Sequence, residues 1–405
     1  MNVKWFRRFR HCFICIFDSH LARRFILLMA CSLPLTSGIA ADEIDVWVGT
    51  SKIGIYHLKL DTERGVLTNP TRASDIKGAG FLALHPTEPI LYSTNREGPG
   101  GVTAFAIGSN PKIGLRAETR DSKNPGTNQL TLLNTLSTGD GGAACVSVDK
   151  TGRVLMSAQY GGGSVSTYLL DSDGRLDKRV DTIEHGQGSG VFAKRQDESH
   201  PHWVGTSPDN RFLMVPDLGQ DRVVVYELNA ENARLKLHSK LVVPPGSGPR
   251  HMKFHENGKY LYVLNELSLT VSVFEYDATS GVAKNIQLIE TLPRDLKDKH
   301  LNSAAEIRIH PNGKFVYTSN RGHDSITVFS VDPNTGKLAF VEREHIRGSI
   351  PRNFNIEPSG KWLIAAGQNS NTLALFEIDP TSGELVFSRK IINVPAPICV
   401  LFESE

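Results

Sequence analysis

Short runs rich in Val, Ile, Phe and Tyr alternate along most of the chain with clusters of Gly, Asn, Asp and Pro. Runs of this kind occupy residues 260–264, 270–276, 315–319 and 373–378. Apolar segments of this length, bounded by turn residues, are typical of strands in an antiparallel meander. Apolar residues at helical spacing are nearly absent. The pattern therefore predicts an all-β fold.

A turn of the form Pro-x-Gly-Lys recurs after the first strand of each repeating unit. Its fullest copy is His-Pro-Asn-Gly-Lys at residues 310–314, followed by a strand, a second turn and another strand. The copies begin at positions 85, 149, 207, 255, 310 and 357, so they lie 47 to 64 residues apart. A four-stranded propeller blade takes about 40–50 residues. The larger gaps therefore predict inserted loops, which we place at residues 111–128 and 185–202.

The two ends of the repeat region complement each other. Residues 44–49 and 54–60 form strands without a leading strand, and residues 398–402 form a leading strand without followers. Together they make a seventh blade, and a closed ring has no strand edges on which another chain could aggregate. An eight-bladed ring or a sandwich would leave one end unpaired. We therefore expect one seven-bladed β-propeller over residues 42–405.

Residues 1–41 have a different composition from the rest of the chain. Five arginines precede an apolar run at residues 25–33, and small residues follow at 37–41. This order is typical of a secretory leader, so we expect cleavage near Ala40 or Ala41 and a periplasmic or secreted protein. The residues before Cys31 also resemble a lipoprotein cleavage box, although Met29 fits it poorly. If the leader is misread, the protein is cytoplasmic.

A membrane anchor is disfavoured, because a spanning helix needs about 20 apolar residues and the leader run is shorter. We expect no membrane span in the mature chain. The charge balance also argues against nucleic acid as a partner. The chain has 45 Lys and Arg against 43 Asp and Glu, a formal net charge of +2, and the two signs alternate. A nucleic-acid-binding domain needs a basic face, whereas a small anion needs only local positive charge.

Two cysteines remain beyond the leader, Cys145 and Cys399, and both lie in apolar runs that are expected to be strands. The repeat places them on the leading strands of two blades with another blade between. The Cα atoms of a disulfide lie within about 7 Å of each other. We therefore expect both thiols to be unpaired and buried.

Departures from the repeat are better candidates for a functional site than the residues that all units share. His202 has no counterpart in other units, and Glu266 stands where Arg96 and Arg321 occur elsewhere. By contrast, histidines recur at 85, 255 and 310 and asparagines at 95, 265 and 320. We interpret these recurring side chains as turn residues, since such groups bond to the backbone of their own turn.

Charged residues and histidines cluster in four stretches, at residues 199–203, 246–251, 263–267 and 318–324. If the blades are equivalent, all four stretches lie at one end of the ring. Arg250 and Arg321 can bind a phosphate, a carboxylate or a developing oxyanion. A His and a Glu can divide the acid and base steps near neutral pH. These groups suit an anionic ester as substrate.

Neither a covalent nucleophile nor a metal is indicated by the motifs. The chain has no Gly-x-Ser-x-Gly elbow and no His-Glu-x-x-His sequence. A Ca²⁺ or Mg²⁺ site built from loops would leave no such signature. We expect no metal and no cofactor.

The chain resembles the seven-bladed lactonase family, which includes the propeller type of bacterial 6-phosphogluconolactonase and the fungal carboxymuconate-cyclising enzyme. The resemblance runs from about residue 45 to the C-terminus and is most specific in the stretches 200–202, 215–222, 248–251, 265–267 and 319–325. It implies a catalytic set of His202, Arg250, Glu266 and Arg321. In the same stretches we expect four substrate-binding residues, namely Asp217, His251, Asn265 and His323.

The expected function is hydrolysis of a small anionic or sugar lactone by a monomer. In this hypothesis His202, assisted by Glu266, activates water, and the arginines hold the substrate anion and the oxyanion. An export leader departs from the cytoplasmic sugar metabolism of phosphogluconolactonases, so the identity of the lactone stays open. Two alternatives remain, a muconate-type cycloisomerase and a non-catalytic exported propeller that binds a protein or a glycan.

Overall fold

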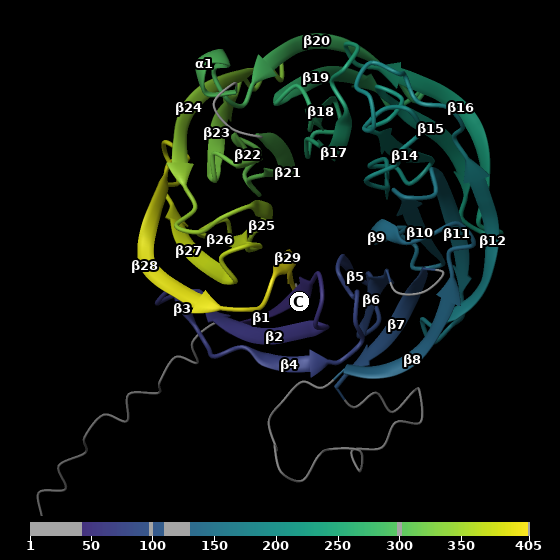
Figure 1. The fold of residues 1–405 in the computed structure, drawn as a ribbon, viewed down its shortest axis with the longest axis horizontal. Coiled ribbons are helices and arrows are strands. Elements are labelled where there is room, and N and C mark those ends of the chain that lie inside the picture. The colour runs from purple at the N-terminus through teal and green to yellow at the C-terminus, as the bar shows by residue number, and fades with distance from the viewer. Residues whose placement is uncertain (1–42, 97–99, 109–129, 298–301, 404–405) are drawn as a thin grey trace, which may run out of the picture. The chain divides into compact units, whose positions relative to one another are not determined.

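A computed structural model of the chain describes residues 43–96, 100–108, 130–297 and 302–403. The compact unit of residues 41–405 consists of seven antiparallel sheets arranged as a ring (Figure 1). The expected seven-bladed propeller is therefore confirmed. The expected leader at residues 1–41 and the expected insert at residues 111–128 lie outside the described residues.

Six blades are each built from four consecutive strands, paired in chain order from the centre of the ring outwards. The first three of these blades are β5 (Leu82–Leu84), β6 (Ile90–Asn95), β7 (Gly101–Ile107) and β8 (Leu130–Ser137); β9 (Ala143–Val148), β10 (Val154–Gln159), β11 (Ser164–Leu170) and β12 (Leu176–Glu184); and β13 (Gly205–Thr206), β14 (Phe212–Asp217), β15 (Arg222–Asn229) and β16 (Arg234–Val242).

The next three blades are β17 (Pro249–Phe254), β18 (Tyr260–Asn265), β19 (Thr270–Asp277) and β20 (Val282–Glu290); β21 (Ser303–Ile309), β22 (Phe315–Arg321), β23 (Ser325–Val331) and β24 (Leu338–His345); and β25 (Pro351–Ile356), β26 (Trp362–Gly367), β27 (Thr372–Ile378) and β28 (Leu385–Asn393). A short helix, α1 (Arg294–Lys297), follows β20. Among the described residues, no helix is long and apolar enough to cross a bilayer.

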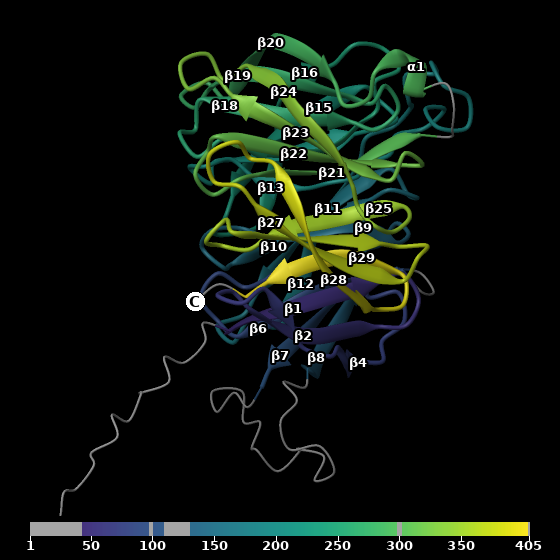
Figure 2. The same cartoon turned by 90° about the vertical axis from the view of Figure 1, so that its left-hand side faces the viewer.

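The seventh blade joins the two ends of the described chain. Its innermost strand is β29 (Pro397–Phe402), which pairs antiparallel with β1 (Glu43–Thr50), Val400 lying opposite Val48. Figure 1 and Figure 2 both show β29 beside β1. The blade continues through β2 (Ile55–Asp61), with β3 (Val66–Leu67) and β4 (Thr71–Ser74) along its outer edge. The predicted closure is confirmed.

Burial follows the position of a strand within its blade. The second strand β18 is buried at every position, whereas the outer strand β20 has only exposed or partly exposed side chains. The reason is that neighbouring blades pack face to face: Tyr262 and Val271 of one blade share an apolar cluster with Val316 and Phe329 of the next. Cys145 and Cys399 are free and buried, as expected.

The recurring histidines link each blade to the next. In each case Nε2 lies 2.9 Å from a glycine carbonyl oxygen in the following blade, and the pairs are His85 with Gly152, His255 with Gly313, and His310 with Gly360. The other ring nitrogen, Nδ1, accepts a hydrogen bond from a backbone N–H of the same turn. Their interpretation as turn residues is confirmed, and the structure adds a clasp between blades.

We expect His310→Ala to lower the free energy of unfolding by about 1–3 kcal/mol, because the side chain is buried and both ring nitrogens are hydrogen-bonded. Urea denaturation followed by circular dichroism measures the change. The control is His345→Ala, which alters an exposed side chain on β24 and should cost less than about 0.5 kcal/mol. Equal losses in the two variants would contradict the clasp.

Candidate functional site

A cavity of about 600 Å³ lies at the end of the ring where the inner strands begin. We call it the arginine cavity. Six of the seven blades contribute to its lining, through residues at or next to the ends of inner and second strands: Arg96, Ala144, His202, Glu266, Arg321 and Arg352. The structure thus brings three of the four expected catalytic side chains to a common cavity from distant parts of the chain.

The Glu266 carboxylate lies at the centre of this group and is bound by three guanidinium groups. Its Oε2 atom is 2.9 Å from Arg250 Nε and 3.0 Å from Arg321 Nη2, and its Oε1 atom is 2.5 Å from Arg195 Nη2. Burial alone would raise the pKa of Glu266, but Arg321, Arg250 and Arg195 together lower it to about 2. Glu266 is therefore a permanent anion and a weak base.

Arg250 lies behind Glu266 and does not line the arginine cavity. Its side chain is only 2% exposed, and besides Glu266 it donates to the backbone carbonyl of Ala305. Burial and the charge of Arg321 lower the pKa of Arg250 to about 10 in spite of Glu266. Arg250 therefore fixes the carboxylate in place and is itself cationic at neutral pH.

His202 combines burial with a free ring nitrogen. The residue is 4% exposed, and its Nδ1 is buried with no hydrogen-bond partner among the described residues. The residue lines the arginine cavity. Burial, followed by the charges of Arg250 and other nearby cations, lowers the pKa of His202 well below 6.5. The imidazole is therefore neutral at physiological pH and can accept a proton.

The turn that carries His202 is positioned by Asp217. One carboxylate oxygen of Asp217 accepts the backbone N–H of His200 at 2.7 Å, and the other lies 2.7 Å from His185 Nδ1. The backbone N–H of His202 also donates to Pro216 O at 3.0 Å. Asp217 is fully buried and does not line the cavity. The structure thus places this expected substrate-binding residue in a supporting position.

His251 lies beneath His202 and also does not line the arginine cavity. The two ring centroids are 5.3 Å apart, and a gap of about 10 Å³ adjoins both rings. His251 Nδ1 is 3.1 Å from Glu306 Oε1, while Nε2 is buried without a partner among the described residues. Burial lowers the pKa of His251 to about 4, although Glu306 opposes the shift. His251 therefore contacts His202 as a neutral ring.

Asn265 and His323, the other two expected substrate-binding residues, are not brought to the cavity. Asn265 Nδ2 donates to Thr270 Oγ1 and to Ser272 Oγ, both at 2.9 Å, within its own blade. His323 Nδ1 is 2.8 Å from Ser325 Oγ, and its ring centroid is 5.8 Å from that of His345 on the outer strand β24. Adjacent side chains of a strand point in opposite directions, so Glu266 reaches the cavity while Asn265 does not. His323 lies beyond the end of β22, in the turn that leads to β23.

Sequence reasoning missed Arg352, which lines the cavity from the start of β25. Within the described residues its guanidinium has no hydrogen bond or ion pair, and burial together with Arg250 and Arg321 lowers its pKa well below 12.5. A signal was present in the sequence, because Pro351 and Arg352 repeat the Pro-Arg pair that opens β17 with Arg250. The free guanidinium is placed to receive an anion.

Arg195 was also missed, because it lies inside the predicted insert of residues 185–202. This segment folds back over the ring, and Gln196 Nε2 donates to Leu218 O at 2.8 Å and to Asp221 Oδ1 at 2.7 Å. The fold-back carries Arg195 to Glu266 of the next blade. An insert has no repeat partner from which its position could be inferred.

The arginine cavity carries a strong positive charge. Its lining holds four guanidinium groups and the single carboxylate of Glu266, a net charge of +3 with His202 neutral; the four cations are Arg96, Arg195, Arg321 and Arg352. A low-dielectric cavity of this sign attracts small anions. The described residues contain no cluster of three or more His, Cys, Asp or Glu that could hold a metal ion.

Comparison with known proteins gives a consistent result. Residues 45–402 match the family model described as "Lactonase, 7-bladed beta-propeller". The chain is 36% identical over 351 residues to a 6-phosphogluconolactonase of Bacillus subtilis, which covers 86% of this chain and 94% of the relative.

Two solved structures are also similar. One is the periplasmic gluconolactonase of Pseudomonas aeruginosa, with a TM-score of 0.80 and 29% identity over 89% of this chain and 99% of the other. The other is a putative 6-phosphogluconolactonase from Bacteroides fragilis, with a TM-score of 0.79 and 29% identity over 90% and 99%.

We expect Glu266→Ala to lower the free energy of unfolding by about 3–5 kcal/mol, because it leaves buried Arg250 without its carboxylate. The control is Glu227→Ala, which breaks an exposed pair with Lys236 and should cost less than about 1 kcal/mol. Urea denaturation at pH 7 measures both. Similar midpoints for Glu266→Ala and wild type would show that the carboxylate does not hold the arginines.

Wild type and Glu266→Ala should also differ in how their free energy of unfolding changes in acid, measured by urea denaturation. A carboxylate whose pKa falls from 4.5 to about 2 on folding stabilises the protein above pH 4.5 and loses that contribution as the pH falls toward 2. Wild type should therefore lose more stability than Glu266→Ala between pH 5 and pH 3.

Proposed function

The chain belongs to the seven-bladed β-propeller lactonase family, and from this premise we propose that it hydrolyses an anionic sugar lactone to the hydroxy acid. One observation carries the proposal: the neutral imidazole of His202 and the unpaired guanidinium of Arg352 line the same cavity, whose net charge is positive. The first supplies a base for water, and the second supplies a site for the substrate anion.

His202 is the general base in this proposal. Nε2 removes a proton from a water molecule as the water oxygen attacks the lactone carbonyl carbon. The ring C–O bond then breaks, and the imidazolium returns the proton to the departing ring oxygen. Glu266 is not assigned as the base, because its carboxylate is already bound by three guanidinium groups that lower its pKa to about 2. Its role is to hold Arg321 and Arg195 in place.

The arginines divide into two roles. Arg321 and Arg195 are oriented by Glu266 and face the cavity, so they are placed to stabilise the oxyanion that forms at the carbonyl. Arg352 and Arg96 face the same cavity without a carboxylate partner among the described residues, and they take the anionic group of the substrate. Arg250 acts through Glu266 and is a positioning residue.

The names of the relatives support a sugar lactone as the substrate, but they differ in whether that lactone is phosphorylated. The Bacillus subtilis relative is named a 6-phosphogluconolactonase, and the Pseudomonas aeruginosa structure is a periplasmic gluconolactonase. We propose that this chain is exported, as its N-terminal pattern predicts. We propose a phosphorylated or carboxylated lactone as substrate, because a net charge of +3 in the cavity favours a multiply charged ligand.

A lactone panel tests the reaction. The protein is expressed from the full-length chain and assayed by pH-stat on 6-phosphoglucono-δ-lactone, glucono-δ-lactone and a muconate. We expect lactone hydrolysis and a loss of about 10²–10⁴ in kcat for His202→Ala, with His345→Ala unchanged. Turnover of the muconate alone would favour a cycloisomerase. Full lactonase activity in folded His202→Ala and Arg250→Ala would refute the proposed site.

The role of Arg352 gives a sharper prediction. We expect Arg352→Ala to lower kcat/KM for the phosphorylated lactone by about 10²–10³, and for glucono-δ-lactone by much less. Folding should be unharmed, because the guanidinium has no partner to leave behind. The control is Arg343→Ala, which removes an arginine on β24 that bonds to Thr291 O and Thr327 Oγ1. It should leave kcat/KM for both lactones unchanged. Equal losses on both lactones would remove Arg352 from anion recognition.

A further inference from the structure

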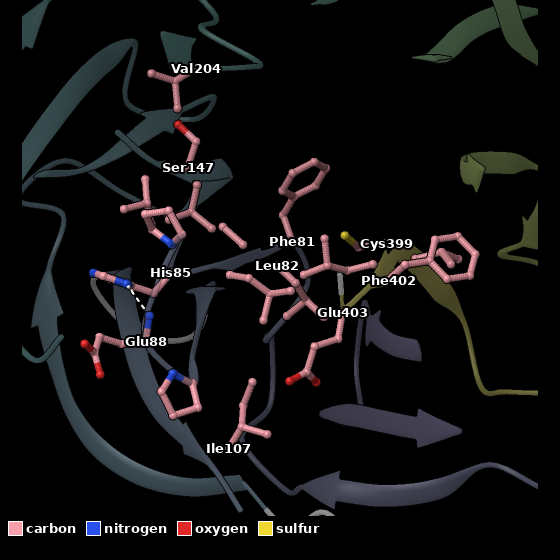
Figure 3. A pocket seen from close by; sticks show the side chains of 18 of the residues that line it. Phe81, Leu82, His85, Glu88, Ile107, Ser147, Val204, Cys399, Phe402 and Glu403 are labelled. Atoms are coloured by element: carbon pink, nitrogen blue, oxygen red, sulfur yellow. Dashed lines mark hydrogen bonds between the residues drawn. The ribbon is translucent and has the colours of Figure 1, made fainter. Parts of the chain in front are cut away.

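A second cavity, of about 660 Å³, lies at the opposite end of the same inner strands (Figure 3). Strand β9 extends from one cavity to the other, since Ala144 lines the arginine cavity and Ser147 lines the second one. On β17, Arg250 stands behind the arginine cavity, whereas Lys253 lines the second. The two cavities therefore share strands but not residues of the lining.

A packed polar layer separates them. Its centre is Glu306, which is fully buried. The carboxylate lies 3.1 Å from His251 Nδ1 and accepts a hydrogen bond from Asn353 Nδ2. His251 and Asn353 are buried as well, and no residue lines both cavities.

The inner wall of the second cavity is positively charged. Lys253 Nζ lies 5.3 Å from the centroid of the Trp203 ring and has no hydrogen bond or ion pair among the described residues. Burial and the charge of Arg308 lower the pKa of Lys253 to about 8. Arg308 Nη2 is 3.5 Å from Glu306 Oε2. Glu306 itself does not line the cavity, so Lys253 and Arg308 are the cations that the inner strands contribute to its wall.

Ser147 of β9 also lines this space. Ser147 Oγ is buried and has no hydrogen-bond partner among the described residues. Buried polar atoms of native proteins are nearly always hydrogen-bonded, and a rotation of the Ser147 side chain toward the cavity would let its hydroxyl bond to a polar ligand. The apolar part of the lining includes Phe81 and Trp203, which offer aromatic surface to a carbon chain.

Two further carboxylates, Glu88 and Glu403, line the cavity from segments that follow the inner strands. Glu403 Oε2 accepts a hydrogen bond from Trp47 Nε1 at 2.9 Å. In Figure 3 both residues lie apart from Ser147 and Val204. They would repel a second negative charge on a ligand, so the cavity suits a monoanion.

We propose that the second cavity binds a small polyhydroxy monocarboxylate. Its carboxylate would lie between Lys253 and Arg308, a hydroxyl would bond to Ser147, and its carbon chain would contact Trp203. Hydroxy acids of this class are what lactone opening produces, so the site would bind product away from the place where it is formed. Only that last link rests on the proposed function.

Sodium gluconate is the probe, and isothermal titration calorimetry is the measurement. The protein, expressed from the full-length chain, carries Arg352→Ala to weaken binding in the arginine cavity. In that background we expect gluconate binding to persist. Adding Lys253→Met should weaken it by about tenfold or more, and adding Ser147→Ala should weaken it several-fold.

The matched control is Lys361→Met, because Lys361 also stacks on a tryptophan, with Nζ 5.2 Å from the Trp362 ring, but lies outside the cavity. It should leave binding unchanged. Lys253→Met removes a charge that has no partner among the described residues, so the urea midpoint of unfolding should not fall. If the midpoint of Lys253→Met does fall, Ser147→Ala serves as the second probe of the cavity.

The proposal is overturned if gluconate does not bind, if Arg352→Ala alone abolishes binding, or if neither Lys253→Met nor Ser147→Ala weakens it. If no lactone in the panel is hydrolysed, the proposal of gluconate binding still stands. If gluconate binds at the second cavity, that result does not support the proposed hydrolysis. The two proposals can therefore fail independently.

Discussion

The arrangement of the arginine cavity depends on one buried carboxylate. Glu266 neutralises part of the charge of Arg250, Arg321 and Arg195, which come from the inner strand of its own blade, from the next blade and from an insert of the preceding blade. Without it, three guanidinium groups would face one another with no counter-charge, and the buried Arg250 would lose its carboxylate partner. The same carboxylate cannot neutralise every cation present. The remaining positive charge in the cavity lies on Arg352 and Arg96, and under the proposed function it would favour an anionic substrate.

The ring makes this concentration of charge possible. Each inner strand runs along the central channel, so its first residues face one end and its last residues face the other. Contacts between blades then fix the relative positions of side chains that are more than a hundred residues apart. The hydrogen bond from each recurring histidine to the next blade is a contact of this kind, and the pairing of β29 with β1 closes the ring. A closed ring of this kind holds its site rigidly, because no blade can shift without disturbing two neighbours.

Much of this could be predicted from the sequence, for a physical reason. A repeated turn marks equivalent points in every blade, and the unmatched ends predict the closing pair, so the fold followed from periodicity. His202 and Glu266 stood out because they break the repeat. Asn265 was expected at the cavity because it adjoins Glu266, but side-chain direction changes from one residue to the next. His323 was expected there because it is close to Arg321 in the sequence, but it lies in the turn after β22. Arg195 lies in an insert, where the repeat says nothing about position. Arg352 could have been found from its Pro-Arg pair.

The positive field also bears on how His202 could work as a base. In the free protein, burial and surrounding guanidinium groups lower the pKa of His202 and so oppose its protonation. An anion bound by Arg352 would offset part of that field, and the basicity of the imidazole would rise as the substrate enters. Proton abstraction would then be coupled to the charge of the substrate and not only to its shape. A neutral lactone of the same size would bind less well and would also meet a weaker base, so selectivity for an anionic substrate would be expressed in kcat as well as in KM.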